Sequence, residues 1–548
     1  MSRQKKVRKG EEQPAIPFSF RPEWVPILFA FFVLALAPRL YGSLTFGANL
    51  DGPGTFQVIN YDEGGSCRAA LGAFKYPTFV GQQIVAIASA LGYAPPRTPT
   101  GRQWEKSYCQ SRPLIVIQRV YSAILGSLTV VLLGLISLMT WPNRAEIAWT
   151  ACALLALSSF HVAQSHSGTV DASQVFFIYL LVSILTYVVA SPRQWSLILS
   201  PMALICAVWV KWYVFAVFAY AGVLAQLDFK KRSVRGVAVV VAVVAVGAVA
   251  LGWDDIMEVI SRRRALFWGN ETTRFGTGYA NIGTWRRWIR NAVNLPVVHI
   301  VGLGLPACLF VWTGLKHALA DRVRRPLWLA HAPAAVYGAY MLLLGPITYY
   351  RYYLPLFPVT VLLASYGFWE SGWSRRKLFL ILFLIYPALL TLDSEYNYRN
   401  DPRREVRPWY AKHSDARLYA TYYVVPPKAA KQVRLFNPDS YLRYGNRYLG
   451  AADYLILSEN WYDTAFPNEL NGPIAWRPEW LIKTTPEYAL TYRRILSNQD
   501  PSLKLEVEFK LKHFMPEFLL HRLFYGSFQL FVGDLRIYRV VAESEPTS

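Results

Sequence analysis

Residues 114–140 read LIVIQRVYSAILGSLTVVLLGLISLMT, an apolar run long enough to cross a bilayer as one helix. Similar runs recur through the first 392 residues. In hydrocarbon the backbone has no water to bind, so each run should form a helix. We therefore predict an α-helical polytopic membrane protein with about eleven transmembrane helices. The predicted spans are 24–42, 114–140, 147–164, 172–190, 196–210, 213–227, 236–252, 296–314, 327–345, 353–369 and 378–392.

The composition agrees with a membrane protein of more than one structural unit. The chain has 548 residues, 53% of them hydrophobic, and a formal net charge of +22. Such a length exceeds what one hydrophobic core usually organises. In a soluble protein the charge would suggest nucleic-acid binding, but the sequence contains no nucleic-acid motif, so we expect no such partner. In a membrane protein the same excess reflects cytoplasmic Lys and Arg and contact with anionic lipid.

Basic residues set the predicted orientation. Residues 3–9 are basic, and the apolar run that follows lacks a small-residue cleavage site. This pattern predicts a first transmembrane helix with a cytoplasmic N-terminus, not a cleaved signal peptide. Every short loop predicted to be cytoplasmic then carries Lys or Arg, in agreement with the positive-inside rule. These residues are Arg144; Arg193; Lys230, Lys231, Arg232 and Arg235; Lys316, Arg322, Arg324 and Arg325; and Arg375, Arg376 and Lys377.

The predicted outer segments differ from the cytoplasmic loops. Two long polar loops cover 43–113 and 253–295, and we expect a short interfacial helix at 285–289 in the second. Cys67 and Cys109 both fall in the first loop. An oxidising compartment permits a disulfide between them, which would contribute about 4 kcal/mol in the chain-entropy model. Two free thiols are the alternative.

The transmembrane pattern stops after residue 392. Residues 393–548 alternate short β-like runs with helical stretches, which predicts a small water-soluble α/β domain. An odd number of spans places this domain outside the cytoplasm. We therefore divide the chain into a membrane domain, 1–392, and an extracytoplasmic domain, 393–548. The predicted strands are 418–423, 453–458, 503–509 and 535–541, and the predicted helices are 402–412 and 485–497.

Carboxylates gather on the predicted outer face. Asp62 and Glu63 are adjacent in the first outer loop, and two neighbouring carboxylates suit general-base catalysis. A solvated turn is the simpler explanation on spacing alone. Asp171 opens the fourth predicted helix, with His166 shortly before it. Helix capping is the simpler explanation of this aspartate.

Two cations lie at the same predicted depth. Lys211 separates the fifth and sixth spans, and Arg351 enters the tenth span among tyrosines that include Tyr352. Interfacial anchoring explains Lys211 and an aromatic belt explains the tyrosines, but neither requires Arg351. A guanidinium can form a fork with a phosphate. Acids that activate a hydroxyl would then lie beside cations that hold a phosphate.

These motifs resemble those of the GT-C glycosyltransferases. The acidic pair, the His-x-x-x-x-Asp segment at 166–171, the RYYLPLFP run at 351–358 and the segments 119–185 and 401–409 look like the protein O-mannosyltransferases and bacterial aminoarabinose transferases. The resemblance covers most of residues 24–411. It implies a glycan-biosynthesis enzyme of a bacterial or archaeal plasma membrane. Such an enzyme moves a hexosyl or pentosyl group from a polyprenyl-phosphate carrier to an extracytoplasmic glycan, lipid or protein, with inversion.

The resemblance also implies roles for the outer-face residues. The expected site comprises catalytic Asp62, Glu63 and Asp171, donor-phosphate-binding Lys211 and Arg351, and supporting His166 and Tyr352. A divalent metal held by Glu63, Asp171 or His166 is left open, and no other cofactor is expected. Gly64 and Gly65 follow the two acids, where the aminoarabinose transferases have other residues. The resemblance therefore does not imply that this chain uses the substrate of those transferases.

Two other classes of function stay open at this point. A transporter or flippase of a lipid-linked sugar would place its charges near the bilayer midplane and would often show inverted repeats, which this sequence lacks. A non-catalytic scaffold with a partner-binding outer domain would tolerate neutralised acids.

Overall fold

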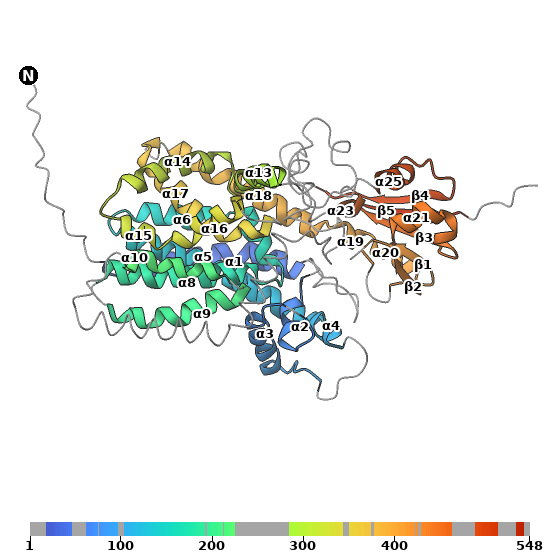
Figure 1. The fold of residues 1–548 in the computed structure, drawn as a ribbon, viewed down its shortest axis with the longest axis horizontal. Helices are drawn as coiled ribbons and strands as arrows, with labels where there is room; N and C mark the ends of the chain where they lie inside the picture. Colours follow the sequence, from blue (N-terminus) through green and yellow to red (C-terminus); the bar gives the residue numbers. More distant parts are fainter. Residues whose placement is uncertain are drawn as a thin grey trace, which may run out of the picture.

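A computed structural model gives the fold, and its helical part and a five-stranded sheet lie at opposite ends of the described molecule (Figure 1). The structure describes residues 18–45, 62–74, 76–96, 104–191, 194–211, 213–224, 284–343, 350–373, 377–421, 424–425, 429–462, 488–512 and 533–541.

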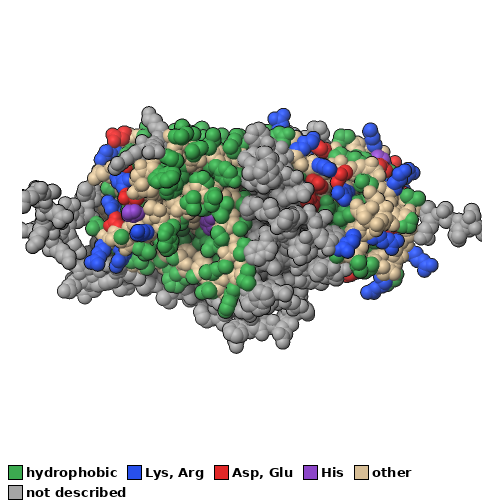
Figure 2. Space-filling view, turned by 90° about the horizontal axis from the view of Figure 1, so that it is seen from above, with side chains coloured by type: hydrophobic (Ala, Val, Ile, Leu, Met, Phe, Trp, Pro, Cys, Tyr) green, Lys and Arg blue, Asp and Glu red, His purple; other side chains and the backbone are tan. Residues whose placement is uncertain are grey.

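Several helices in the described part of the chain can cross a membrane. Four are long and apolar enough, and the number rises to six if each of two bent helix pairs is one span. The chain is therefore an integral membrane protein. Apolar side chains cover the described face of the helical part (Figure 2). The four helices are α1 (Trp24–Thr45), α5 (Arg112–Thr140), α8 (Asp171–Ala190) and Leu378–Lys412, which begins as α18 (Lys377–Arg399).

The remaining predicted spans are shorter or broken helices. The span predicted at 147–164 is α6 (Ala145–Ala156) followed by α7 (Ser159–His166), with a bend of 53° between them. The others are η1 (Gln194–Leu199) with α9 (Ser200–Lys211), η2 (Val214–Ala219) with α10 (Tyr220–Leu224), α15 (Arg325–Leu329) with α16 (Ala332–Leu343), and η3 (Tyr350–Leu356) with α17 (Phe357–Glu370). The span predicted at 236–252 lies outside the described residues, so the total of about eleven stays a prediction.

The span predicted at 296–314 is not one continuous helix. Helices α13 (Thr284–Leu303) and α14 (Leu305–Ala320) meet within it at a bend of 116°. Gly304, between them, has a φ of 88°, a backbone conformation that favours glycine. Pro306 then lies in the first turn of α14, where its missing N–H costs least. Apolar residues continue across this break, so hydropathy alone does not reveal it.

Glycines bring two of these helices into direct backbone contact. A Cβ placed on Gly314 of α14 would lie 1.9 Å from the carbonyl oxygen of Leu363 in α17. One placed on Gly367 of α17 would lie 2.1 Å from the carbonyl oxygen of Phe310 in α14. Small residues allow this close approach between membrane helices. The contact fixes α17, which directly follows η3 and its Arg351.

The first predicted outer loop forms a compact helical unit. Its helices are α2 (Gly65–Ala70), α3 (Phe79–Ala90) and α4 (Trp104–Cys109). A disulfide joins Cys67 to Cys109, whose Cα atoms are 5.7 Å apart. The unit lies at the end of the helical part nearest the C-terminal sheet (Figure 1). In the second predicted outer loop, the expected short helix at 285–289 is instead the beginning of α13.

A mixed sheet organises the C-terminal region, with the strand order β2-β1-β3-β5-β4. Strand β1 pairs in parallel with β2 and β3, and β5 pairs antiparallel with β3 and β4. Alternate strand residues enter two separate apolar clusters, so both faces of the sheet are covered. The strands are β1 (Arg417–Ala420), β2 (Gln432–Leu435), β3 (Tyr454–Ser458), β4 (Leu503–Phe509) and β5 (Leu535–Val540).

The helices of this region partly match the predicted ones. The stretch predicted at 402–412 divides into α19 (Pro402–Glu405) and α20 (Arg407–Lys412), and the stretch at 485–497 contains α25 (Ala489–Leu496). All four predicted strands are present within a few residues. Strand β2 was not predicted, because its alternation of polar and apolar residues extends over only four residues, the shortest run that marks a strand. The other short helices are α21 (Pro438–Tyr444), α22 (Asn446–Leu449) and α23 (Glu459–Tyr462).

Candidate active site

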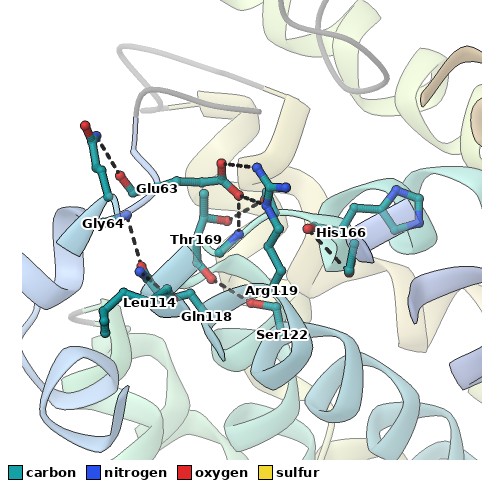
Figure 3. Close-up of polar contacts among 12 residues, drawn as sticks. Glu63, Gly64, Leu114, Gln118, Arg119, Ser122, His166 and Thr169 are labelled. Carbon is teal, nitrogen blue, oxygen red and sulfur yellow. Dashed lines mark hydrogen bonds and ion pairs between the residues drawn. The ribbon is translucent and has the colours of Figure 1, made fainter. Parts of the chain in front are cut away.

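The acidic turn before α2 is anchored by Glu63. Arg119 of α5 donates to both Glu63 carboxylate oxygens, at 2.8 and 2.9 Å, and both side chains are fully buried. The backbone N–H of Gly168, before α8, donates to the same carboxylate at 2.8 Å. Figure 3 shows Glu63 between Arg119 and this segment. Glu63 therefore connects the acidic turn to two other parts of the membrane domain.

Gln118, the residue before Arg119, holds the next position of the turn. Its amide oxygen accepts a hydrogen bond from the Gly64 N–H at 3.0 Å, and its amide nitrogen donates to the Cys109 and Leu114 carbonyls at 3.0 Å (Figure 3). Gly64 has a φ of 82°, which favours glycine at this sharp turn. Consecutive residues of α5 thus hold consecutive residues of the turn.

Sequence reasoning missed the partners Gln118 and Arg119. A signal was nevertheless present, because both lie inside an otherwise apolar predicted span. Ionisable residues in such spans usually face the protein interior and pair there. An arginine at this position therefore calls for a buried acid, and Glu63 is that acid.

Asp62 points to a different partner from its neighbour Glu63. Its carboxylate forms an ion pair with Arg351 of η3, with 2.7 Å between the oxygen and nitrogen atoms. The two side chains are 14% and 10% exposed, so this pair retains some contact with solvent, unlike the Glu63–Arg119 pair. Two adjacent acids therefore have different environments.

Asp171 and Lys211 form a second ion pair close to the first. Lys211 is the last residue of α9, and its ammonium group contacts the Asp171 carboxylate. Arg351 also interacts electrostatically with Asp171. The ring of Tyr352 lies beside both cations, with its centroid 4.8 Å from the Lys211 nitrogen and 5.8 Å from the Arg351 guanidinium carbon. We call Asp62, Asp171, Lys211, Arg351 and Tyr352 the charged cluster.

Helix capping does not account for Asp171. The N-cap residue of α8 is Val170, and Asp171 lies inside the first turn. A carboxylate there interacts favourably with the helix dipole. Its ion pair with Lys211 adds a second, specific interaction.

His166 belongs to a different contact. Its ring nitrogen lies 2.8 Å from Glu395 of α18, and its ring meets that of Tyr398 edge to face, with the centroids 4.5 Å apart. A Cβ on Gly42 of α1 would overlap the ring, so the imidazole lies flat against that helix. Figure 3 shows the His166 ring pointing away from Glu63.

The residues considered for a metal have separate partners. Glu63 binds Arg119, Asp171 binds Lys211, and His166 contacts Glu395. Among the described residues, no group of three or more His, Cys, Asp or Glu side chains is arranged to hold a metal ion. Glu63, Asp171 and His166 therefore do not come together as the ligands of one metal ion.

Comparison with known proteins identifies the class. Residues 74–251 match the family described as dolichyl-phosphate-mannose-protein mannosyltransferase. The chain is thus a membrane glycosyltransferase. Residues 74–251 form a domain of the protein mannosyltransferase family, within the GT-C group. The match includes Arg119, Asp171 and Lys211 but not Asp62 or Arg351.

Several solved structures are also similar to this chain. ArnT from Cupriavidus metallidurans in the apo state is 13% identical with a TM-score of 0.45, over 81% of this chain and 95% of that one. The archaeal oligosaccharyltransferase AglB from Archaeoglobus fulgidus is 13% identical with a TM-score of 0.47, over 83% and 72%. The Saccharomyces cerevisiae Pmt1–Pmt2 complex is 19% identical with a TM-score of 0.35, over 46% and 36%. No curated protein matches the chain significantly.

Proposed function

We propose that this enzyme transfers a sugar from a polyprenyl-phosphate carrier to a hydroxyl acceptor outside the cytoplasm, with inversion. The observation that carries the proposal is the charged cluster, in which two acids and two cations meet around Tyr352. The family description supports a polyprenyl-phosphate-linked donor. The Lys and Arg pattern of the predicted loops supports an extracytoplasmic site.

Asp62 is the base in this proposal. Its carboxylate takes the acceptor proton while the acceptor oxygen attacks the anomeric carbon from the face opposite the phosphate. The bond between the anomeric carbon and the phosphate oxygen breaks, and its electron pair leaves with the polyprenyl phosphate. Attack from the opposite face inverts the anomeric configuration.

Arg351 and Lys211 stabilise the departing phosphate. A cation about 4 Å from a new negative charge contributes roughly 4 kcal/mol at an effective dielectric constant near 20. Such a difference corresponds to about a thousandfold in rate. Asp171 keeps Lys211 in place through their ion pair. Tyr352 supports both cations through its ring.

Glu63 and His166 have positioning roles in this scheme. Glu63 is fully buried and already accepts three hydrogen bonds, from Arg119 and Gly168, so it orients the turn that carries Asp62. His166 lies in the segment that leads to Asp171 and contacts Glu395 of α18. We assign the catalytic site to the membrane domain, 1–392, and a separate role to 393–548.

The test is Asp62→Asn in purified protein reconstituted with lipid. Polyprenyl-phosphate sugars are supplied with an extract of native membranes as the acceptor source, and released polyprenyl phosphate is measured. We expect at least a hundredfold loss of release. Asp321→Asn is the control, because Asp321 also forms an ion pair, with Arg324, at the end of α14. Near wild-type release by Asp62→Asn would remove Asp62 from the mechanism.

The same assay separates this proposal from a transporter or flippase. Transport of a lipid-linked sugar moves the intact molecule and releases no polyprenyl phosphate. Movement of labelled donor across the bilayer without release would favour the transport alternative.

A further inference from the structure

Tyr76 lies in the segment between α2 and α3, which is fixed against the acidic turn. The Ser66 hydroxyl of α2 donates to the Pro77 carbonyl at 2.9 Å. A Cβ on Gly81 of α3 would lie 1.9 Å from the Ser66 carbonyl oxygen, so the two helix backbones are in contact. Tyr76, the residue before Pro77, is therefore held beside α2.

The ring of Tyr76 packs toward the acids. Its edge carbon is 3.8 Å from the position that a Cβ of Gly65 would take, at the end of the acidic turn. The ring also packs against an apolar cluster that contains Val170 and Val210. These two residues directly precede Asp171 and Lys211. Tyr76 thus lies between the turn that carries Asp62 and the elements that carry the second ion pair.

The phenol group interacts electrostatically with the charged cluster. Its neighbours there are Asp62, Asp171, Arg351 and Tyr352. Burial raises the pKa of Tyr76 well above its usual value, and the two carboxylates raise that pKa further, while Arg351 opposes the rise. The hydroxyl therefore stays protonated and is a hydrogen-bond donor, not a base.

We propose that Tyr76 is a further substrate-binding residue, which donates its phenol hydrogen to the phosphate of the lipid-linked sugar. This inference rests on the proposed function. The acids of the cluster already pair with cations, so a neutral donor adds a hydrogen bond to phosphate without changing the net charge. Hydrogen bonds to charged groups exceed those between neutral groups in strength.

The test is Tyr76→Phe, which removes the hydroxyl and keeps the ring. We expect affinity for undecaprenyl phosphate and kcat/KM for the sugar donor each to fall roughly tenfold or more. Tyr108→Phe is the matched control, because the Tyr108 hydroxyl of the same outer unit donates to the Tyr93 carbonyl at 2.7 Å. The control should retain both values. Thermal unfolding of each variant checks that the fold is unchanged.

The affinity for undecaprenyl phosphate tests this inference separately from the proposed function. If the wild type binds undecaprenyl phosphate but releases none from any donor, the proposed transfer fails while the affinity of Tyr76→Phe still decides the role of Tyr76. Equal affinity in Tyr76→Phe and wild type overturns that role. Excess inorganic phosphate should compete weakly, and competition equal to that of undecaprenyl phosphate would contradict a lipid-linked ligand.

Discussion

Glu63→Gln tests whether the buried ion pair positions the acidic turn. The substitution keeps an oxygen for the Gly168 N–H but turns one acceptor of Arg119 into an amide donor. Arg119 then keeps its charge in a fully buried site without a matching carboxylate from Glu63. We expect both the stability of the membrane domain and the rate of sugar transfer to fall.

The magnitude follows from the burial of both partners. Removing one member of a buried, hydrogen-bonded ion pair typically costs about 3–5 kcal/mol. The free energy of unfolding should fall by an amount in this range. If the same interaction holds Asp62 in its reactive position, transfer should fall by about a hundredfold to a few thousandfold, because each 1.4 kcal/mol corresponds to a factor of roughly ten.

A double-mutant cycle with an internal control makes this test quantitative. The cycle combines Glu63→Gln with Arg119→Gln and should give a coupling energy of about 2 kcal/mol or more. The control is Glu146→Gln, whose partner Arg144 lies at 3.1 Å but is 35% exposed. An exposed pair contributes about 1 kcal/mol at most. Equal effects of Glu63→Gln and Glu146→Gln on unfolding and transfer would refute the reasoning.

Two further predictions concern the first predicted outer loop and the C-terminal sheet. Replacing Cys67 and Cys109 together by Ser should lower the free energy of unfolding by about 4 kcal/mol, since the bridge spans 42 residues of sequence. Thermal unfolding of the wild type and of this variant, with and without reductant, checks the prediction. Equal free energies of unfolding of the two proteins without reductant would contradict it. Burial, and to a smaller extent Glu459, raises the pKa of Asp534 from 3.8 to about 7. The folded state then binds more protons than the unfolded state between these values, so stability should fall as pH rises from about 4 to 7, by up to roughly 4 kcal/mol. Asp534→Asn should remove this dependence of stability on pH, which the hydrogen exchange of β4 and β5 measures. An unchanged pH profile of exchange in the variant would count against the prediction.

The apolar spans could be predicted where one helix crosses without interruption. The bounds of α1, α5 and α8 lie within a few residues of the predicted spans. The break at Gly304 could not be predicted, because it depends on backbone conformation while the apolar pattern continues through it. Tyr386 packs directly against Gly304, a tertiary contact that hydropathy does not contain.

The charged cluster could be assembled in outline from orientation alone. Asp62, Asp171, Lys211 and Arg351 were expected on one face, and the structure pairs them. The pairing itself could not be derived, since Asp62 and Arg351 are separated by most of the membrane domain in sequence. His166 was expected beside Asp171, but it is the last residue of α7, and its ring contacts Glu395 and Tyr398 of α18.

The adjacency of Asp62 and Glu63 has a physical explanation that the sequence alone does not supply. Consecutive Cα atoms are about 3.8 Å apart, so fixing one residue of a turn fixes the backbone of the next to within a small distance. Arg119 and Gly168 fix Glu63, and Gln118 fixes Gly64 on the other side. Asp62 is thereby held by its neighbours, and its own carboxylate forms an ion pair with Arg351. A residue inserted between the two acids should leave the contacts of Glu63 intact and displace Asp62, so the proposed mechanism requires the two acids to be consecutive.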